Sequence, residues 1–463
     1  MQARKCGLMI IGIDDTDSRE GMCTTYLAAV LIEKLKKYGA VKEHPLLVRL
    51  NPNIIYKTRG NAALAIPLEL YNGKSAEKVK EVVIGTVKDM AVFSDENTNP
   101  GVVFVENATE KMLSDLAKFS MRAVQDVLEI REAKELLERH GIHHRGFKNG
   151  RGLIGALAAA GFALSELPDF TYELIAYREK KRWGTLREIE EDSVWAADAA
   201  TYPDTWDTVD YENKRIVFAP HSPDPILFGI RGKSECAVRE AFSIVKSEPI
   251  ERYVVYKTNQ NTDMHLIPAR IGEAKNDRSY ILKGTVSSPP KTIEGGHVIF
   301  GLLENGANLE CAAFEPTKGF RNIIRQLRSG DEITVCGGVK ERTLNIEKIR
   351  VIYLNVHELR NPLCCGKRMK SMGKEQGYRC EKCGAVRKEQ VTETLQRNLS
   401  PGFYEVPPSA RRHLSKPLIR FQETKAACAC VRSKKCEQAV DPQHLQGNFS
   451  LPRKRPFFHQ PAW

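Results

Sequence analysis

The sequence has 463 residues, of which 42% are hydrophobic, and a formal net charge of +12 from 70 Lys and Arg against 58 Asp and Glu. At roughly 100 to 200 residues per domain, this length predicts several domains. No apolar run approaches the ~18 residues needed to cross a bilayer, and the opening stretch reaches Asp14 and Asp15 without a small-residue cleavage site. These features argue against an integral membrane protein and a secreted protein, so we expect a cytoplasmic protein with no membrane partner.

The positive charge is concentrated near the C-terminus. Residues 361–463 hold 20 Lys and Arg but only 8 Asp and Glu, so the whole surplus lies in this quarter of the chain. Clustered cations bind phosphates favourably because counterions are released. The pattern predicts an enzyme-like body joined to a polyanion-binding region, with a solvated basic tail as the alternative.

Residues 1–140 predict a mixed α/β unit. Short apolar runs, typical of buried strands, alternate with stretches whose apolar residues recur at helical spacing. We expect four strands and three helices: strands at Gly7–Ile13, Leu46–Leu50, Ala62–Leu70 and Val102–Val105, and helices at Thr24–Tyr38, Ala76–Met90 and Glu110–His140.

Two further units follow. Residues 141–268 predict a compact α+β domain with a helix at Glu235–Val245 and strands at Tyr172–Tyr177, Ile216–Ala219, Ile226–Ile230 and Tyr253–Tyr256. Residues 269–357 contain five short strands and a late helix at Phe320–Leu327, which suits an OB-type barrel. A small barrel that binds no nucleic acid is the alternative. Residues 358–420 are rich in cysteine and basic residues, and residues 421–463 lack periodicity and are expected to be disordered.

An acidic loop follows the first predicted strand. It contains Asp14, Asp15 and Asp17. Three carboxylates within four positions repel one another unless they share a cation or several N–H donors, so Mg²⁺ holding the phosphates of ATP is a natural occupant. A polar turn with an N-capping aspartate is the alternative.

The next helix begins with two adjacent hydroxyls, Thr24 and Thr25. A helix N-terminus offers unpaired N–H groups and the positive end of the helix dipole, which favour phosphate. Either threonine could instead be an N-cap. Cys23 precedes them, but the sequence identifies no histidine partner for a cysteine nucleophile.

Three more loops contain candidate nucleotide or metal contacts. The loop with Lys57, Arg59 and Asn61 can hold polyphosphate or be a solvated turn. The turn around Asp95 either adds a metal ligand or only reverses the chain. A glycine-rich stretch lacks the Lys-Ser/Thr ending of a Walker loop and suits either close contact with phosphate or tight helix packing, and its candidates are Gly150, Arg151 and Gly152.

The cysteines after residue 360 predict a zinc site. Cys380 and Cys383 have the two-residue spacer of a zinc knuckle, whereas Cys364 and Cys365 are adjacent. We expect these four thiolates to hold one zinc ion. Because the adjacent pair is unusual, one of them could be replaced by another ligand from His357, Cys428, Cys430 and Cys436.

Eight stretches together resemble the archaeal tRNA 2-agmatinylcytidine synthetases. The resemblance runs from about residue 8 to residue 420, in the same order and with similar spacing. The stretches are Gly12–Ser18, Gly21–Tyr26, Tyr56–Asn61, Thr98–Gly101, Gly150–Leu157, Thr262–Leu266, Ala313–Lys318 and Pro401–Leu418.

The resemblance implies a kinase-like catalytic domain, a ferredoxin-like domain, an OB fold and a zinc ribbon. It implies a ligase that converts ATP to AMP and joins agmatine to carbon 2 of the wobble cytidine in the isoleucine tRNA with a CAU anticodon. The threonine that accepts phosphate in the family matches Thr24. The adjacent Cys364 and Cys365 and the residues after 420 depart from the family pattern.

Two other functions fit parts of the sequence. The first is a non-catalytic nucleic-acid-binding protein built on the barrel and the zinc module, which would not turn over ATP. The second is a related ligase that uses another amine or another tRNA. The acidic residues that would hold the agmatine guanidinium cannot be identified from the sequence.

Overall fold

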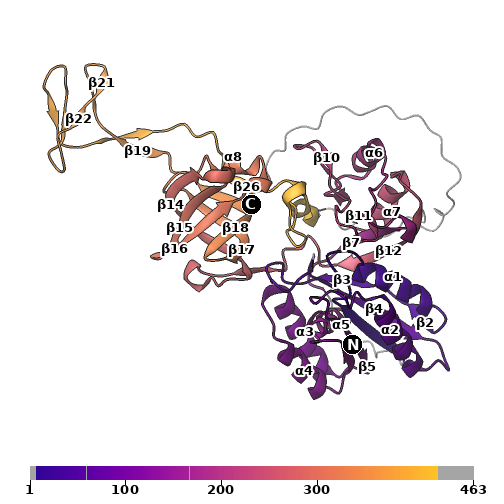
Figure 1. Ribbon diagram of the computed structural model, residues 1–463. Helices are drawn as coiled ribbons and strands as arrows, with labels where there is room; N and C mark the ends of the chain where they lie inside the picture. Colours follow the sequence, from indigo (N-terminus) through magenta and orange to yellow (C-terminus); the bar gives the residue numbers. More distant parts are fainter. Residues whose placement is uncertain (1–6, 59, 166, 426–463) are drawn as a thin grey trace.

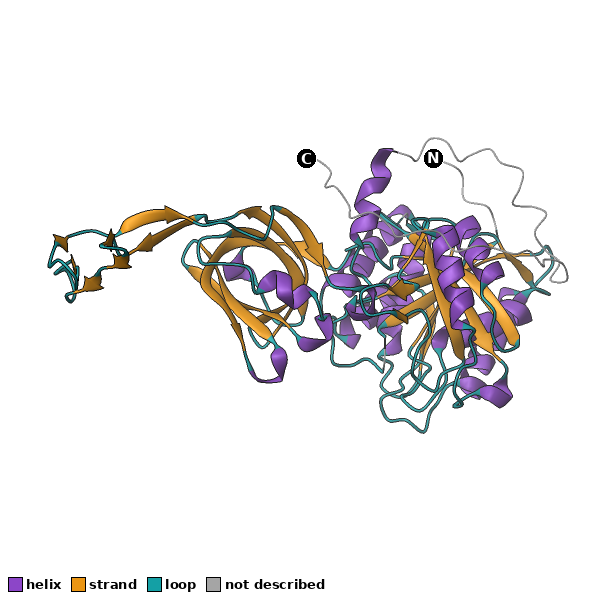
Figure 2. Cartoon of the chain, turned by 90° about the horizontal axis from the view of Figure 1, so that it is seen from above, coloured by secondary structure: helices purple, strands orange, loops and turns teal. Residues whose placement is uncertain are grey.

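The computed structural model describes residues 7–58, 60–165 and 167–425. It has three parts in a row: a large mixed sheet with helices on both faces, a β-barrel, and a thin extension on the side of the barrel away from the sheet (Figures 1 and 2). Among the described residues, no helix is long and apolar enough to cross a membrane.

The large sheet has ten strands, in the order β6-β5-β1-β4-β3-β12-β7-β11-β8 with β2 beside β4. Its first half is built from β1 (Leu8–Asp14), β2 (Gly39–Val41), β3 (Leu46–Arg49), β4 (Ala62–Leu70), β5 (Gly101–Glu106) and β6 (His143–Gly146). The central strand β1 is antiparallel to both β4 and β5. These strands are continuous apolar runs because helices cover both of their faces.

Alternate residues of β1 belong to two separate cores. Ile10 packs toward α3 (Glu110–Gln125), α4 (Ile130–Arg139) and α5 (Gly152–Leu164). Met9 and Ile11 pack on the other face, toward α1 (Thr24–Leu35) and α2 (Ala76–Met90). The single helix predicted at Glu110–His140 is wrong: α3 ends at an extended Asp126, and a capping box between Glu129 and Glu132 starts α4.

The second half of the sheet contains β7 (Thr171–Arg178), β8 (Thr205–Trp206), β11 (Ile226–Gly232) and β12 (Ile250–Thr258), with helices α6 (Glu191–Thr201) and α7 (Glu235–Ile244). β12 runs parallel to β3 and joins the two halves. The predicted strand at Ile216–Ala219 is shorter, because only β10 (Arg215–Ile216) pairs, with β9 (Val209–Asp210).

The predicted boundary at residue 140 falls within the first half of the sheet. β6 pairs with β5, and α5 packs on β1, β4 and β5. The predicted division at this point stays a prediction, because one continuous sheet spans both units.

The middle part of the molecule is a closed five-stranded barrel, preceded by β13 (Leu266–Pro268), which runs parallel to its first strand. The barrel strands are β14 (Arg278–Thr292), β15 (Val298–Glu304), β16 (Ala307–Ala313), β17 (Glu332–Lys340) and β18 (Thr343–Tyr353). They follow the order β14-β15-β16-β18-β17, and pairing of β17 with β14 closes the ring. The short helix α8 (Phe320–Ile324) lies between the third and fourth strands.

The extension carries the cysteine cluster. Its base is a pair of strands, β19 (His357–Arg360) and β25 (Val391–Thr394). Beyond them lie one pair of short strands, β20 (Leu363–Cys364) and β21 (Lys367–Arg368), and one three-stranded sheet of β22 (Lys370–Ser371), β23 (Tyr378–Arg379) and β24 (Val386–Arg387). The chain thus leaves the barrel, forms the extension and returns.

Residues 402–420, which we call the strap, bind the barrel to the sheet. They begin with β26 (Gly402–Glu405), which pairs with β18, and Leu414 is buried in the core beneath α5. Arg411 pairs with Asp207 at 3.1 Å, and Arg420 pairs with Asp169 at 2.8 Å. In Figure 1 the end of the strap and the short yellow helix that follows from it lie between the barrel and the sheet.

The strap corrects the interpretation of the basic C-terminal quarter. Four cations of the strap pair with carboxylates of the sheet part and the barrel, and their positive charge is therefore used within the protein. They are Arg411, Arg412, Lys416 and Arg420. The predicted disorder of residues 421–463 concerns mostly residues outside the described ranges.

Candidate active site

A cleft lies at the carboxyl end of β1. Its wall brings together most of the predicted site residues from segments far apart in the sequence. The predicted residues that line it are Asp14, Asp15, Asp17, Lys57, Asn61, Arg151 and Gly152.

The acidic loop is held by the turn around Asn99. The Asn99 N–H donates to Asp15 Oδ2 at 3.0 Å, and the Thr98 hydroxyl donates to the Asp17 carbonyl at 2.6 Å. Burial and the charge of Asp15 raise the pKa of Asp14 well above its ordinary value, and burial raises the pKa of Asp15 to about 7. These crowded carboxyls are the donor set that suits a divalent cation with oxygen ligands.

Thr24 lies behind the acidic loop, and it is not among the residues that line the cleft. It is 5% exposed, and its Oγ1 accepts from the Thr16 hydroxyl at 3.1 Å. Cys23 occupies the N-cap position of α1, so both threonines lie inside the first turn. Thr25 Oγ1 is 3.0 Å from Cys23 Sγ.

The loop before β4 forms the second wall. The Lys57 ammonium donates to the Pro52 carbonyl, and burial lowers its pKa. The Asn61 amide donates to the Asn51 carbonyl at 3.0 Å, so it supports the loop from within. Arg59, the third candidate in this loop, lies outside the described residues.

Asp95 is not among the lining residues. One of its carboxylate oxygens accepts from the Asn97 N–H at 2.9 Å, so it supports its own turn. Thr98 and Asn99 are the residues of this turn that contact the acidic loop, and neither was predicted as a site residue. Both residues lie in Thr98–Gly101, one of the stretches that resemble the family, and this position was the sequence signal that could have identified them.

The start of α5 forms the third wall, where packing and charge are combined. Gly150 has φ +77°, and a Cβ on Gly152 would lie 2.5 Å from the Gly101 nitrogen. The missing side chain at Gly152 therefore allows α5 to pack closely on β1 and β5, and Gly150 takes a left-handed conformation in the turn before the helix. A contact of this backbone with phosphate stays a prediction. The Arg151 guanidinium stacks over Tyr56, 3.9 Å from the ring centroid, and the charges of Asp15 and Asp14 act on it.

Gly155, one turn further along α5, was not predicted. A Cβ there would lie 2.0 Å from Asp14 Oδ2. The absence of a side chain thus makes room for the Asp14 carboxylate. This dependence joins a helix position to a strand end 141 residues earlier, which no local pattern shows.

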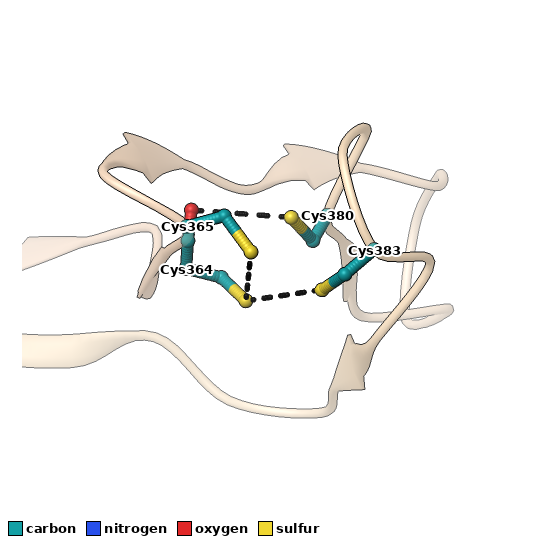
Figure 3. A group of neighbouring side chains, drawn as sticks. All are labelled: Cys364, Cys365, Cys380 and Cys383. Atoms are coloured by element: carbon teal, nitrogen blue, oxygen red, sulfur yellow. Dashed lines mark hydrogen bonds between the residues drawn. The ribbon is translucent and has the colours of Figure 1, made fainter.

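The cysteine cluster forms a second candidate site, in the extension. Figure 3 shows the sulfurs of Cys364, Cys365, Cys380 and Cys383 turned toward one another from two loops, and all four lie within 4.8 Å of one another. Cys364 Sγ is 4.0 Å from Cys365 Sγ and 3.5 Å from Cys383 Sγ. Sulfurs about 2.3 Å from one tetrahedral zinc would be about 3.8 Å apart, so the adjacent pair fits. Backbone N–H groups of the knuckle lower the pKa of the Cys380 thiol to about 7, which favours the ligating thiolate.

Comparison with known proteins identifies the family. Residues 10–149 match the TiaS TCKD domain, residues 150–265 the TiaS FLD domain, and residues 361–399 the TiaS C-terminal zinc ribbon domain. The isoleucine-tRNA 2-agmatinylcytidine synthetase TiaS of Methanosarcina mazei is 55% identical over 419 residues, covering 89% of this chain and 97% of the relative. The chain belongs to the TiaS family.

Solved structures of TiaS proteins share the fold. A complex of TiaS with its isoleucine tRNA and ATP matches with a TM-score of 0.81 and 48% identity over 89% of this chain and 97% of the other. A complex of TiaS with the same tRNA, AMPCPP and agmatine matches with a TM-score of 0.80 and 45% identity over 90% and 98%. The resemblance inferred from the sequence is confirmed.

Proposed function

We propose that this chain attaches agmatine to carbon 2 of the wobble cytidine of the AUA-decoding isoleucine tRNA and converts ATP to AMP in the reaction. It is a ligase that forms a carbon–nitrogen bond, and its product reads AUA instead of AUG. The main observation behind this proposal is the cleft, which is lined by three carboxylates together with Lys57 and Arg151. Relatives of the same fold were solved with an isoleucine tRNA, ATP and agmatine.

The architecture supports finer assignments. We infer an OB fold for residues 269–357, since the barrel has the strand order and interposed helix expected of that fold. Residues 1–140 are assigned as the kinase-like domain and residues 141–268 as the ferredoxin-like domain. In residues 358–420, the tRNA-binding cations are then those exposed on the extension, such as Lys367, Lys374 and Arg387.

The cleft residues suit phosphoryl transfer from ATP. Asp14, Asp15 and Asp17 would hold Mg²⁺, which supplies charge neutralisation for the transferred phosphoryl group. Lys57 and Arg151 line the cleft and would offset the remaining negative charge. Arg59 is assigned to the same role from the sequence alone, and Asn61 and the Gly150–Gly152 backbone are proposed as further contacts. Thr24 is the proposed phosphate acceptor, supported by its contact with Thr16 inside the acidic loop. Asp95 remains a candidate only as support for this loop.

The chemistry explains why ATP is needed. Oxygen on carbon 2 of cytosine is a poor leaving group, and phosphorylation makes it a good one. The agmatine amine then loses a proton and forms the new bond to carbon 2, while the oxygen leaves as phosphate. Formation of AMP removes two phosphoryl groups from ATP: one passes to the cytosine oxygen and leaves with it, and the other is transferred to Thr24 and released from it by water. The target base must leave its stack to reach the cleft.

One experiment tests this function against its two rivals. The full chain is incubated with ATP, Mg²⁺, agmatine and unmodified isoleucine tRNA, and the nucleosides are analysed by mass spectrometry. The expected product is cytidine heavier by one agmatine less one water. No ATP turnover would indicate a non-catalytic binding protein, and a product seen only with another amine or tRNA would indicate a different ligase.

A further inference from the structure

A second group of cations lies beside the cleft, where β3 approaches the strap. Arg49 on β3, Lys57 in the loop before β4 and Arg231 on β11 lie close enough to His413 of the strap for their charges to act on its imidazole. The pKa of His413 is held well below its ordinary value by Arg49 first, then by desolvation of the ring, and by Arg231 and Lys57. We call these four side chains the basic recess.

The two arginines of the recess share one buried carboxylate. Arg49 Nη2 lies 3.4 Å from Glu173 Oε2, and Arg231 Nε lies 3.4 Å from Glu173 Oε1. The Glu173 side chain is 4% exposed. Arg49 Nε also donates to Gln260 Oε1 at 2.9 Å. Among the described contacts, the two arginines thus share a single carboxylate, and Lys57 donates to the Pro52 carbonyl instead of to a carboxylate.

Both charge and hydrogen bonding in the recess are incomplete. Partly buried positive charge is costly unless an anion balances it. Gln260 is 0% exposed, and within the described ranges its Nε2 has no hydrogen-bond partner. The surplus of cations and the unpaired amide beside Arg49 indicate an anionic ligand with several acceptor atoms.

The recess is open and adjoins the cleft. His413 is an exposed residue, and its carbonyl accepts from the Asn261 N–H at 2.8 Å, which fixes its backbone. Gly60 lines the cleft on one side. A Cβ on Gly60 would lie 3.2 Å from Arg49 Nη1 and 3.6 Å from His413 Nε2. Gly60 therefore lies between the cleft and the recess.

We propose that the basic recess binds a phosphodiester of the tRNA next to the target cytidine while that base occupies the cleft. This inference rests on the proposed function. A phosphodiester supplies the acceptor oxygens that the arginines and the neutral His413 imidazole require. Agmatine, which carries two positive charges, would be repelled by the three cations. Lys57 borders both spaces, whereas Arg49, Arg231 and His413 are not among the residues that line the cleft. These three thus form a positioning site for the RNA backbone, beside the groups that hold ATP.

Arg231→Gln is the main variant for the test, because Glu173 keeps Arg49 as a partner. Losing a charged hydrogen bond should lower kcat/KM for tRNA by about 10- to 100-fold. ATP-dependent labelling of the protein without RNA should change by less than about twofold, because Arg231 does not line the cleft. Arg231→Lys should restore part of the loss, and Arg131→Gln, on the exposed face of α4, is the charge-matched control.

A neutral linkage in the RNA identifies the bound phosphate. tRNAs are assembled with one methylphosphonate on the 5′ or 3′ side of the target cytidine. One of the two positions should reduce the affinity of the wild-type enzyme as much as Arg231→Gln does, with no further loss when both changes are combined. Binding is measured directly, so this comparison stands even if no agmatinylated product forms.

Two outcomes would overturn the proposal. Strictly additive losses at both methylphosphonate positions would show that Arg231 does not contact either phosphate. An equal rise in the KM for ATP in Arg231→Gln would assign the recess to the nucleotide instead. Thermal unfolding of each variant separates these outcomes from misfolding. His413→Ala, which breaks no ion pair among the described residues, repeats the test without disturbing Glu173.

Discussion

Gly155→Ala should inactivate the enzyme through one carbon atom. A Cβ at this position would lie 2.0 Å from Asp14 Oδ2, whereas an ordinary contact is at least 3.4 Å. The two groups must separate by more than 1 Å, and the Asp14 side chain is the most mobile part. Because a misplacement of about 1 Å can cost about 10²-fold in rate, we expect kcat for tRNA agmatinylation to fall by at least that factor.

The stability change should be modest. Overpacking costs about 1–3 kcal/mol, while replacing glycine by alanine inside a helix returns about 1 kcal/mol. Gly161→Ala is the matched control on the same helix, since its Cβ would lie 2.2 Å from Ser120 Oγ, away from the cleft. We expect both variants to lose similar unfolding free energy and only Gly155→Ala to lose activity.

The measurements are denaturant unfolding, ATP turnover with Mg²⁺, and nucleoside mass analysis. We would reject the importance of the Asp14 position for catalysis if Gly155→Ala kept the wild-type kcat while losing as much stability as Gly161→Ala. Gly85→Ala, in α2 with no described atom within 4 Å of the new carbon, sets the helix-propensity baseline.

Thr24, the zinc cluster, the strap and Glu347 each allow a direct test. Thr24→Ala should abolish protein labelling by γ-labelled ATP, and Thr25→Ala should be milder; undiminished labelling of the first variant would exclude the acceptor role. Cys380→Ser should lose the zinc, measured by elemental analysis, and should unfold the extension, because ligation energy is folding energy for a small module. A chain ending at residue 420 should keep one equivalent of zinc. Loss of zinc on this truncation would show that the tail supplies a ligand. Leu414→Ala should cost about 2–5 kcal/mol of unfolding free energy, since that side chain is 1% exposed in the core. Replacing residues 361–394 by a short linker should change the unfolding free energy of the sheet and the barrel little. A larger loss from the deletion than from Leu414→Ala would contradict the role of the strap. Burial raises the pKa of Glu347, but the positive charges of His265, Arg412 and Lys348 outweigh burial and lower this pKa to about 2. The ionised Glu347 should therefore stabilise the fold by about 3 kcal/mol, an effect that is present above pH 4.5 and lost as the pH falls toward 2. Denaturant midpoints that fall equally with pH in the wild type and in Glu347→Gln would contradict this.

Local features of the chain were predictable because their signals are local. β4 and α2 occupy the predicted residues, Ala62–Leu70 and Ala76–Met90, since apolar periodicity and the Ser75 cap mark them. The acidic loop could be recognised because its three carboxylates are nearly consecutive. The zinc cluster followed from four cysteines within twenty positions, and the adjacent pair proved compatible with it.

Features that depend on distant partners were not predictable. The pairing of β3 with β12 joins residues about 210 positions apart, and neither strand's periodicity identifies the other. The same holds for Gly155 and Asp14. The basic residues of the strap appeared to be free for nucleic acid, because a sequence shows charge but not that Asp207 and Asp169 neutralise Arg411 and Arg420.

The strap also sets an order of events during synthesis. Arg411 follows its partner Asp207 by 204 residues, and Arg420 follows Asp169 by 251. At about 5–20 residues per second, the two carboxylates leave the ribosome about 10 to 50 seconds before their arginines. Shortly before that interval ends, the nascent chain already contains all four zinc ligands, whereas the strap that binds the barrel to the sheet is still missing. Metal loading can therefore precede catalytic competence, and a chain whose translation stops before the strap can carry a folded ribbon without an assembled enzyme.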